Sequence, residues 1–206
     1  MPTQRIQALC EAGDFDGAVA LVVQHFGGRI YTYLLARTQS ALAYSLREQH
    51  AQDIYGEFCV DLVRGLPAFE WRCRLESWLY RLAFHALSRF YRHRERRDSR
   101  HPARASAISQ LAASVAGPST LLWREERENA WTKLRESLDE IEQDLLIWRI
   151  DEELSWEEIA NILYDDSDPA SLAKNLAALR KRFERTRRKL HRLAVQRGLL
   201  PPAGEA

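Results

Sequence analysis

The sequence predicts an all-α protein of two small helical domains joined by a flexible linker. Apolar residues recur at three- and four-residue spacing through most of the 206 residues, which is the period of amphipathic helices. Helix-breaking residues are scarce, with 9 Gly and 7 Pro. The composition changes between residues 98 and 119, where Pro102, Gly117 and Pro118 stand among many Ala and Ser. We therefore expect domains at residues 1–97 and 120–206, with a linker at 98–119.

Roughly four helices are expected between residues 4 and 97, separated at Gly13, at the Gly27-Gly28 pair and at Pro67. One segment, DIYGEFCVDLVRGL, places three apolar residues on one helical face: Ile54, Phe58 and Leu62. Three acids recur every fourth residue on another face: Asp53, Glu57 and Asp61. Stacked carboxylates repel one another mildly, so either solvent or a basic partner must accommodate them.

The next segment, FEWRCRLESWLYRLAFHALSRFYRHRERR, interleaves aromatic and arginine side chains. Some of its apolar residues must be core, and we expect Trp78, Leu79 and Leu82 there. The remaining aromatic and basic residues suit single-stranded DNA, because bases stack on aromatic faces and the phosphate backbone follows a cationic groove. A solvated basic helix end is the simpler interpretation of the final cluster.

The second domain is strongly polarised in charge. Residues 139–168 contain twelve acids and one base, whereas residues 180–192 contain eight bases and one acid. Ser155 is a good N-cap, with Glu158 completing a capping box, and Asp168 with Pro169 predicts the start of a long helix. We expect a helix-turn-helix whose second helix carries Arg and Lys to DNA. A helical hairpin with a solvated basic side remains open.

The faces of these helices follow from the same periodicity. The helix before the break should bury an apolar stripe: Leu138, Ile141, Leu145, Trp148 and Ile150. The helix after Ser155 should bury Trp156, Ile159, Ala160, Ile162 and Leu163. The long helix should turn six basic residues outward: Arg180, Lys181, Arg182, Arg185, Arg187 and Arg188.

Several classes are disfavoured by composition and motif content. The cysteines Cys10, Cys59 and Cys73 are odd in number and lie far from any histidine cluster, so neither a disulfide framework nor a metal site is expected. There is no signal peptide pattern and no apolar run of about 18 residues, so we expect a cytoplasmic protein without membrane insertion. No catalytic motif is evident, and we predict neither enzyme activity nor a cofactor.

Taken in order, these motifs resemble the extracytoplasmic-function (group 4) sigma factors, small members of the sigma-70 family of bacterial RNA polymerase. The family's promoter-melting domain has similar counterparts to residues 53–57 (DIYGE), 78–83 (WLYRLA) and 85–92 (HALSRFYR). Its −35 reader is similar to residues 154–160 (LSWEEIA) and 179–190 (LRKRFERTRRKL). The likeness covers most of residues 22–97 and 120–195.

The resemblance implies a function and a set of partners. It implies promoter-specific transcription initiation, with the first domain melting the −10 element, the second reading the −35 element, and contacts to the β′ clamp helices and β flap of core polymerase. Core-polymerase contacts would come from Asp53, Glu57 and Asp61. Contacts to −10 DNA would come from Trp71, Arg72, Arg74, Trp78, Arg81, His85, Arg89 and Arg92. Contacts to −35 DNA would come from Arg180, Lys181, Arg182, Arg185 and Arg188.

Three departures from the family pattern matter. Residues 45–52, SLREQHAQ, are nearly neutral where the family is acidic. We hypothesise that phosphorylation of Thr38, Ser40 or Ser45 by a Ser/Thr kinase supplies the missing charge, since a phosphate adds about −1.5 to −2. His85 and Arg89 stand where the family usually has Asn and Asp, and residues 164–178 exceed the usual turn and could extend the recognition helix backwards. Control by an anti-sigma factor is the alternative to a kinase.

Two other functions are compatible with the sequence. A dimeric helix-turn-helix repressor or activator would need only the basic second domain and would bind duplex DNA without polymerase. A helical adaptor or anti-sigma-like protein would need no DNA at all.

Overall fold

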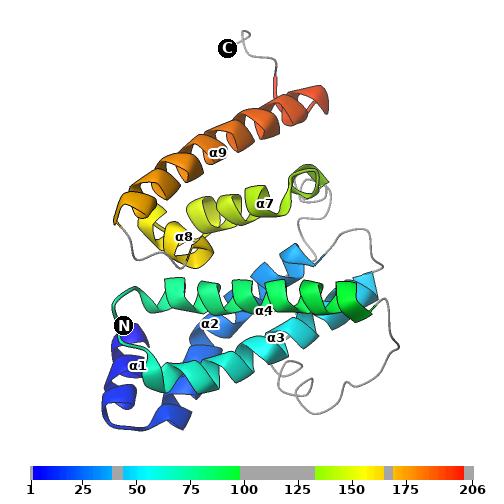
Figure 1. Ribbon diagram of the computed structural model, residues 1–206. Coiled ribbons are helices and arrows are strands. Elements are labelled where there is room, and N and C mark those ends of the chain that lie inside the picture. The colour runs from blue at the N-terminus through cyan, green and yellow to red at the C-terminus, as the bar shows by residue number, and fades with distance from the viewer. Residues whose placement is uncertain (1, 39–43, 98–132, 165–168, 202–206) are drawn as a thin grey trace. The chain divides into compact units, whose positions relative to one another are not determined.

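The computed structural model describes residues 2–38, 44–97, 133–164 and 169–201, and all regular structure within these ranges is helical (Figure 1). The all-α prediction is therefore confirmed for these residues. Contacts along the chain divide it into two compact units, Met1–Pro118 and Ser119–Ala206. The predicted linker at residues 98–119 lies outside the described residues.

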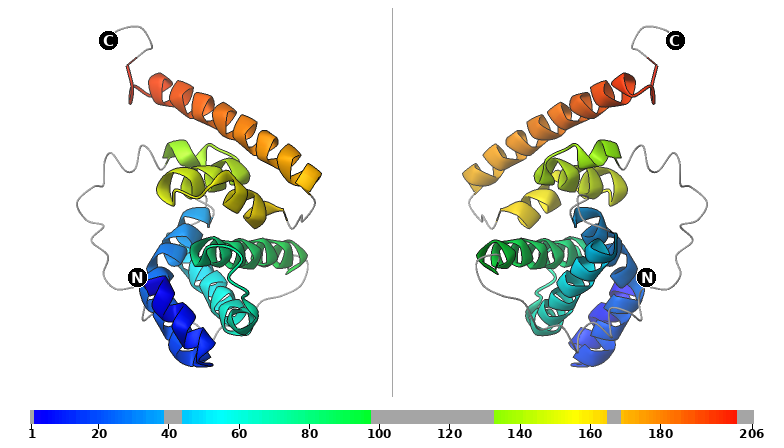
Figure 2. Two further views of the ribbon diagram at one scale, coloured as in Figure 1. Left: turned by 90° about the vertical axis from the view of Figure 1, so that its left-hand side faces the viewer. Right: turned by 90° about the vertical axis from the view of Figure 1, so that its right-hand side faces the viewer.

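Four α-helices make up the described part of the first unit: α1 (Pro2–Glu11), α2 (Phe15–Arg37), α3 (Tyr44–Gly65) and α4 (Leu75–Arg97). A short 3₁₀ turn, η1 (Leu66–Ala68), links α3 to the loop before α4. Helix α2 contacts α1, α3 and α4, and α3 also contacts α4 (Figure 2). The helix number matches the prediction.

The Gly27-Gly28 pair does not end a helix, contrary to the prediction, because α2 runs straight through it. Gly27 is buried, and a Cβ added there would lie 2.5 Å from the Tyr55 hydroxyl oxygen of α3. The missing side chain therefore allows α2 and α3 to approach closely. Gly13, in contrast, does mark a break, since it adopts a φ of 78° between α1 and α2.

The core of the first unit follows the predicted helical faces, with one correction. Ile54, Phe58 and Leu62 of α3 are buried, as is Leu79 of α4. Trp78 and Leu82 are only half-buried, although both were predicted as core. The Trp78 ring stacks on Phe69 of the preceding loop, with centroids 4.6 Å apart, and its edge lies beside Gly65 at the end of α3.

The second unit contains α7 (Glu140–Leu146), a π-helical turn η3 (Ile147–Asp151), α8 (Trp156–Leu163) and α9 (Pro169–Gln196). Helix α9 contacts both α7 and α8. Ser155 caps α8 with the predicted capping box, in which its hydroxyl accepts from the Glu158 amide and Glu158 accepts from the Ser155 amide. The α9 helix begins at Pro169, as predicted, and so extends backwards through residue 178; Asp168 lies outside the described residues.

The π-helical turn alters the predicted apolar stripe. Trp148 is fully buried, but Ile150 is 52% exposed and does not belong to the core. A π turn accommodates one residue more than an α turn, so it changes the face on which the following side chains emerge. The turn is held by Arg149, whose Nη1 donates to the Leu154 carbonyl oxygen at 2.7 Å and whose guanidinium lies over the Trp156 ring.

No helix in the described part of the chain combines the length and the hydropathy needed to cross a membrane.

Candidate functional site

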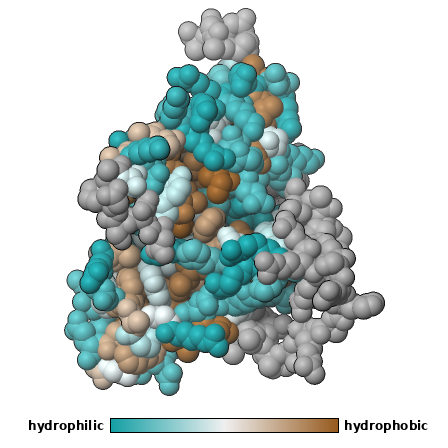
Figure 3. Space-filling view, viewed as in Figure 1, coloured by the Kyte–Doolittle hydropathy of each residue, from teal (hydrophilic) through white to brown (hydrophobic). Residues whose placement is uncertain are grey.

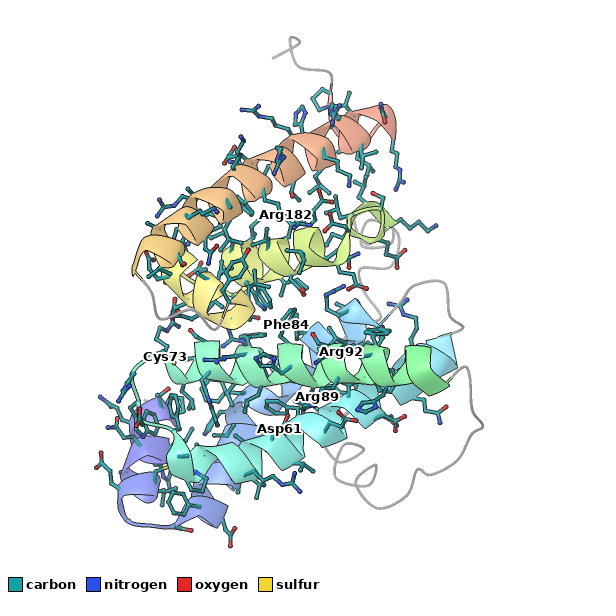
Figure 4. The ribbon with its side chains drawn as sticks, in the orientation of Figure 1. Asp61, Cys73, Phe84, Arg89, Arg92 and Arg182 are labelled. Carbon is teal, nitrogen blue, oxygen red and sulfur yellow. The ribbon has the colours of Figure 1, made fainter. Side chains whose placement is uncertain are left out.

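Asp53, Glu57 and Asp61 form an acidic column along α3, and a cation from α4 occupies part of it. The Arg89 Nη2 donates to Asp61 Oδ2, and Arg89 Nε lies 3.8 Å from Glu57 Oε2. Figure 4 shows Asp61 and Arg89 between α3 and α4. The structure thus joins two sets that the sequence had assigned separately, one to polymerase and one to DNA.

The electrostatics of the acidic column reflect both burial and nearby bases. Burial raises the pKa of Asp53, and His50 acts in the opposite direction. Burial also raises the pKa of Glu57, which Arg89 and His93 oppose. Each carboxylate of the column therefore has at least one basic side chain near it.

An aromatic cluster stands at the loop that precedes α4. Phe69 lies between Trp71 and Trp78, with ring centroids 4.9 Å and 4.6 Å away. Trp71 adopts a φ of 58°, in the left-handed region that bulky residues rarely enter. Such strain persists where the surroundings hold it and is concentrated at functional segments. This loop contains Trp71, Arg72 and Arg74, which the family resemblance assigns to −10 DNA.

Two arginines beside this cluster form ion pairs with glutamates. Arg72 Nε lies 2.9 Å from Glu70 Oε2, and Arg74 Nε lies 3.8 Å from Glu76 Oε2. The Arg72 and Glu70 side chains are 83% and 63% exposed. An exposed pair of this kind contributes little to stability, so Arg72 can exchange a carboxylate for a phosphate at small cost.

The other predicted −10 residues are distributed along α4. Trp78, Arg81 and His85 are half-buried, and the His85 ring lies 6.0 Å from that of Phe84. Arg92 is exposed, and its Nε donates to the Ser88 carbonyl oxygen at 3.2 Å. These residues follow one another along α4 from Trp78 to Arg92.

Helix α9 presents a basic surface, and the view in Figure 3 shows mostly hydrophilic residues over it. Exposed side chains on this surface include Arg180, Lys181, Arg185 and Arg188. Arg182 was predicted to face outward, but it is half-buried and its Nη2 donates to Asp139 Oδ1 at 2.8 Å. Lys189 similarly pairs with Glu142 of α7 at 2.7 Å. Both ion pairs connect α9 to the acidic start of α7.

An open hollow of about 590 Å³ adjoins this surface. Its lining residues are Glu142, Arg185, Arg188, Lys189, His191 and Arg192. Lys189, His191 and Arg192 are not among the site residues predicted from the sequence. Helical spacing could have indicated this extension of the basic surface, because residues 185, 188, 189 and 192 share one helical face. The hollow extends the cationic surface towards the end of α9.

Of the predicted phosphorylation residues Thr38, Ser40 and Ser45, the structure describes the side chain of Thr38. Thr38 is 1% exposed at the end of α2, and its hydroxyl donates to the Leu35 carbonyl oxygen at 2.8 Å. Its phosphorylation therefore requires local opening first. Ser40 lies outside the described residues, and so does the Ser45 side chain.

Within the described ranges, no cluster of three or more His, Cys, Asp or Glu side chains could hold a metal ion. Cys10 and Cys59 are free thiols. Burial raises the pKa of Cys59 to about 11, so this thiol stays protonated at neutral pH.

Comparison with known proteins gives one informative similarity. The chain is 28% identical over 129 residues to the RNA polymerase sigma factor YlaC of Bacillus subtilis (strain 168), covering 61% of this chain and 73% of the relative. This similarity supports membership of the sigma factor family. No family model matches the chain.

Proposed function

We propose that this chain is a small two-domain sigma factor of the extracytoplasmic-function type. It binds core RNA polymerase reversibly in the bacterial cytoplasm and directs initiation at promoters that carry suitable −10 and −35 elements. It has no catalytic activity of its own, because RNA synthesis belongs to the polymerase. The observation that carries this proposal is the similarity to a sigma factor over 129 residues.

The first unit is the proposed melting module. The aromatic cluster of Phe69, Trp71 and Trp78 offers ring faces for an unstacked base, and exposed Arg72 and Arg92 offer charge to the phosphates. The acidic column on α3 is the proposed contact for the β′ clamp helices. A cationic partner surface would suit it, because opposite charges favour encounter and correct orientation.

The second unit is the proposed −35 reader, with α8 and α9 as its helix-turn-helix. Helix α8 is capped at Ser155 and packs on α9, which leaves the basic surface of α9 exposed. In this arrangement the supporting helix crosses the DNA backbone and the second helix enters the major groove. The β flap of polymerase is the proposed protein contact of this unit.

The deciding experiment is a titration of the purified full chain with bacterial core RNA polymerase, followed by promoter binding with and without the polymerase. We expect binding to core, and promoter binding that is strong only in the complex. Arg185→Ala should weaken promoter binding without affecting core binding, and Arg5→Ala, on an exposed position of α1, is the matched charge control. A strong shift of duplex DNA by the chain alone, with no binding to core, would favour the dimeric repressor or activator.

Regulation by phosphorylation is part of the proposal and needs its own variants. Thr38→Glu would place a carboxylate at a buried position, so loss of folding would obscure its effect. Ser40→Glu and Ser45→Glu are the better mimics. Tighter core binding by either would support a kinase as the regulator, and unchanged binding by both would leave an anti-sigma factor as the remaining proposed control.

A further inference from the structure

Arg89 joins the two binding sets of the first unit. The sequence placed Arg89 among the DNA contacts, whereas the structure pairs it with Asp61 and brings it within 3.8 Å of Glu57. Two of the three carboxylates of the acidic column are thus already paired within the molecule.

We propose that Arg89 is an internal occupant of the acidic column, which a cationic surface on a binding partner must displace. The inference rests on the proposed function in one respect, since it takes core polymerase to be that partner. In this proposal Arg89 sets the affinity of the acidic column for the partner. Until the partner binds the column, Arg89 does not contact DNA.

The geometry supports competition for the same carboxylates. Asp53, Glu57 and Asp61 recur at every fourth residue of α3, so they span about 12 Å along its axis. A guanidinium carries five donors and can serve two carboxylates at once, as Arg89 does for Asp61 and Glu57. An Arg or Lys from another protein needs the same carboxylate oxygens.

The pairing is also exchangeable. The side chains of Arg89, Glu57 and Asp61 are 36%, 46% and 26% exposed, so water and other ions reach all three. Partly exposed ion pairs contribute little net stability, because the charges are already well solvated when they separate. A partner that supplies several cations along the column can therefore replace one arginine from α4.

The test compares core-polymerase affinity of the wild type, Arg89→Ala and Arg5→Ala, measured without DNA at about 0.1 M and 0.5 M salt. We expect Arg89→Ala to bind about three- to tenfold more tightly at the lower salt, with the advantage shrinking at the higher salt. Arg5→Ala removes the same charge from exposed α1 and should bind like the wild type. Equal or weaker binding by Arg89→Ala overturns the proposal, as does the same gain in both variants.

A second measurement separates this proposal from the proposed function. A double-mutant cycle with Arg89→Ala and Asp61→Asn, read in the unfolding equilibrium of the full chain, should show a coupling of at least about twofold, as expected for side chains in contact. Additive effects would overturn the internal pairing itself, whatever the polymerase data. A clear coupling with no polymerase binding by any variant would instead overturn the proposed function, and with it polymerase as the displacing partner.

Discussion

The contact between Gly27 and Tyr55 gives a sharp test of how α2 and α3 pack. In Gly27→Ala the new Cβ would lie 2.5 Å from the Tyr55 hydroxyl oxygen and 3.7 Å from Cζ. The first distance is a clash and the second is an ordinary contact. Overpacking of a core costs about 1–3 kcal/mol, while Ala gains up to about 1 kcal/mol over Gly within a helix. We expect a net loss of about 1 kcal/mol.

Two further variants isolate the clash. Tyr55→Phe removes the hydroxyl, so Gly27→Ala in that background should lose its penalty and keep the helical gain. Gly28→Ala is the matched control, because this neighbouring glycine is exposed and a Cβ there meets nothing within 4 Å. It should stabilise the protein by about 0.5–1 kcal/mol.

The assay is urea unfolding of the full chain followed by far-UV circular dichroism. Hydrogen exchange of α2 and α3 amides assigns the change to the first unit. Equal effects of Gly27→Ala and Gly28→Ala, or no rescue by Tyr55→Phe, would refute the packing argument.

Three other predictions address the second unit and the buried thiol. Ser155→Ala should destabilise the protein by about 1 kcal/mol in urea unfolding, because the capping box of α8 is lost, and Ser155→Asp should retain most of that stability. Arg185→Ala should reduce the slope of log promoter affinity against log salt concentration by about one, because one phosphate contact is lost. Arg182→Ala should leave this slope nearly unchanged and should instead lower the stability of the protein, because the ion pair with Asp139 is lost. Burial raises the pKa of Cys59 to about 11 from 9.0, so the folded state favours the protonated thiol. The contribution of this thiol to stability should be fully present below pH 9 and should be lost as the pH rises towards 11. In thermal melts at different pH values, Cys59→Ala should reduce this decline.

Local signals in the sequence predicted the helices well. The Ser155 capping box and the start of α9 at Pro169 depend on neighbouring residues, so they could be read directly from the chain. The buried face of α3 followed from periodicity for the same reason, and so did Ile159, Ala160 and Ile162 of α8, whereas Trp156 and Leu163, also predicted to be buried, are half-buried. Gly27 was misinterpreted because its role depends on Tyr55, which lies on another helix.

The candidate surfaces were predicted less completely, since pairing between distant charges has no local signature. Arg182 shares the composition of its exposed neighbours, and only the position of Asp139 distinguishes it. Arg89 likewise could be assigned to DNA by its place in the motif, while its pairing with Asp61 spans 28 residues. The burial of Thr38 follows from tertiary packing that a short polar motif does not reveal.

The length of α9 has a consequence for how affinity and specificity are divided. Its 28 residues extend about 42 Å, whereas the major groove is about 12 Å wide. When α9 docks as proposed, most of its length must lie outside the major groove, along the sugar-phosphate backbone. Cations on the overhanging part attract any duplex alike, and the short inserted part alone discriminates among sequences. Substitutions on the overhang could therefore retune promoter strength without redirecting the protein to other promoters.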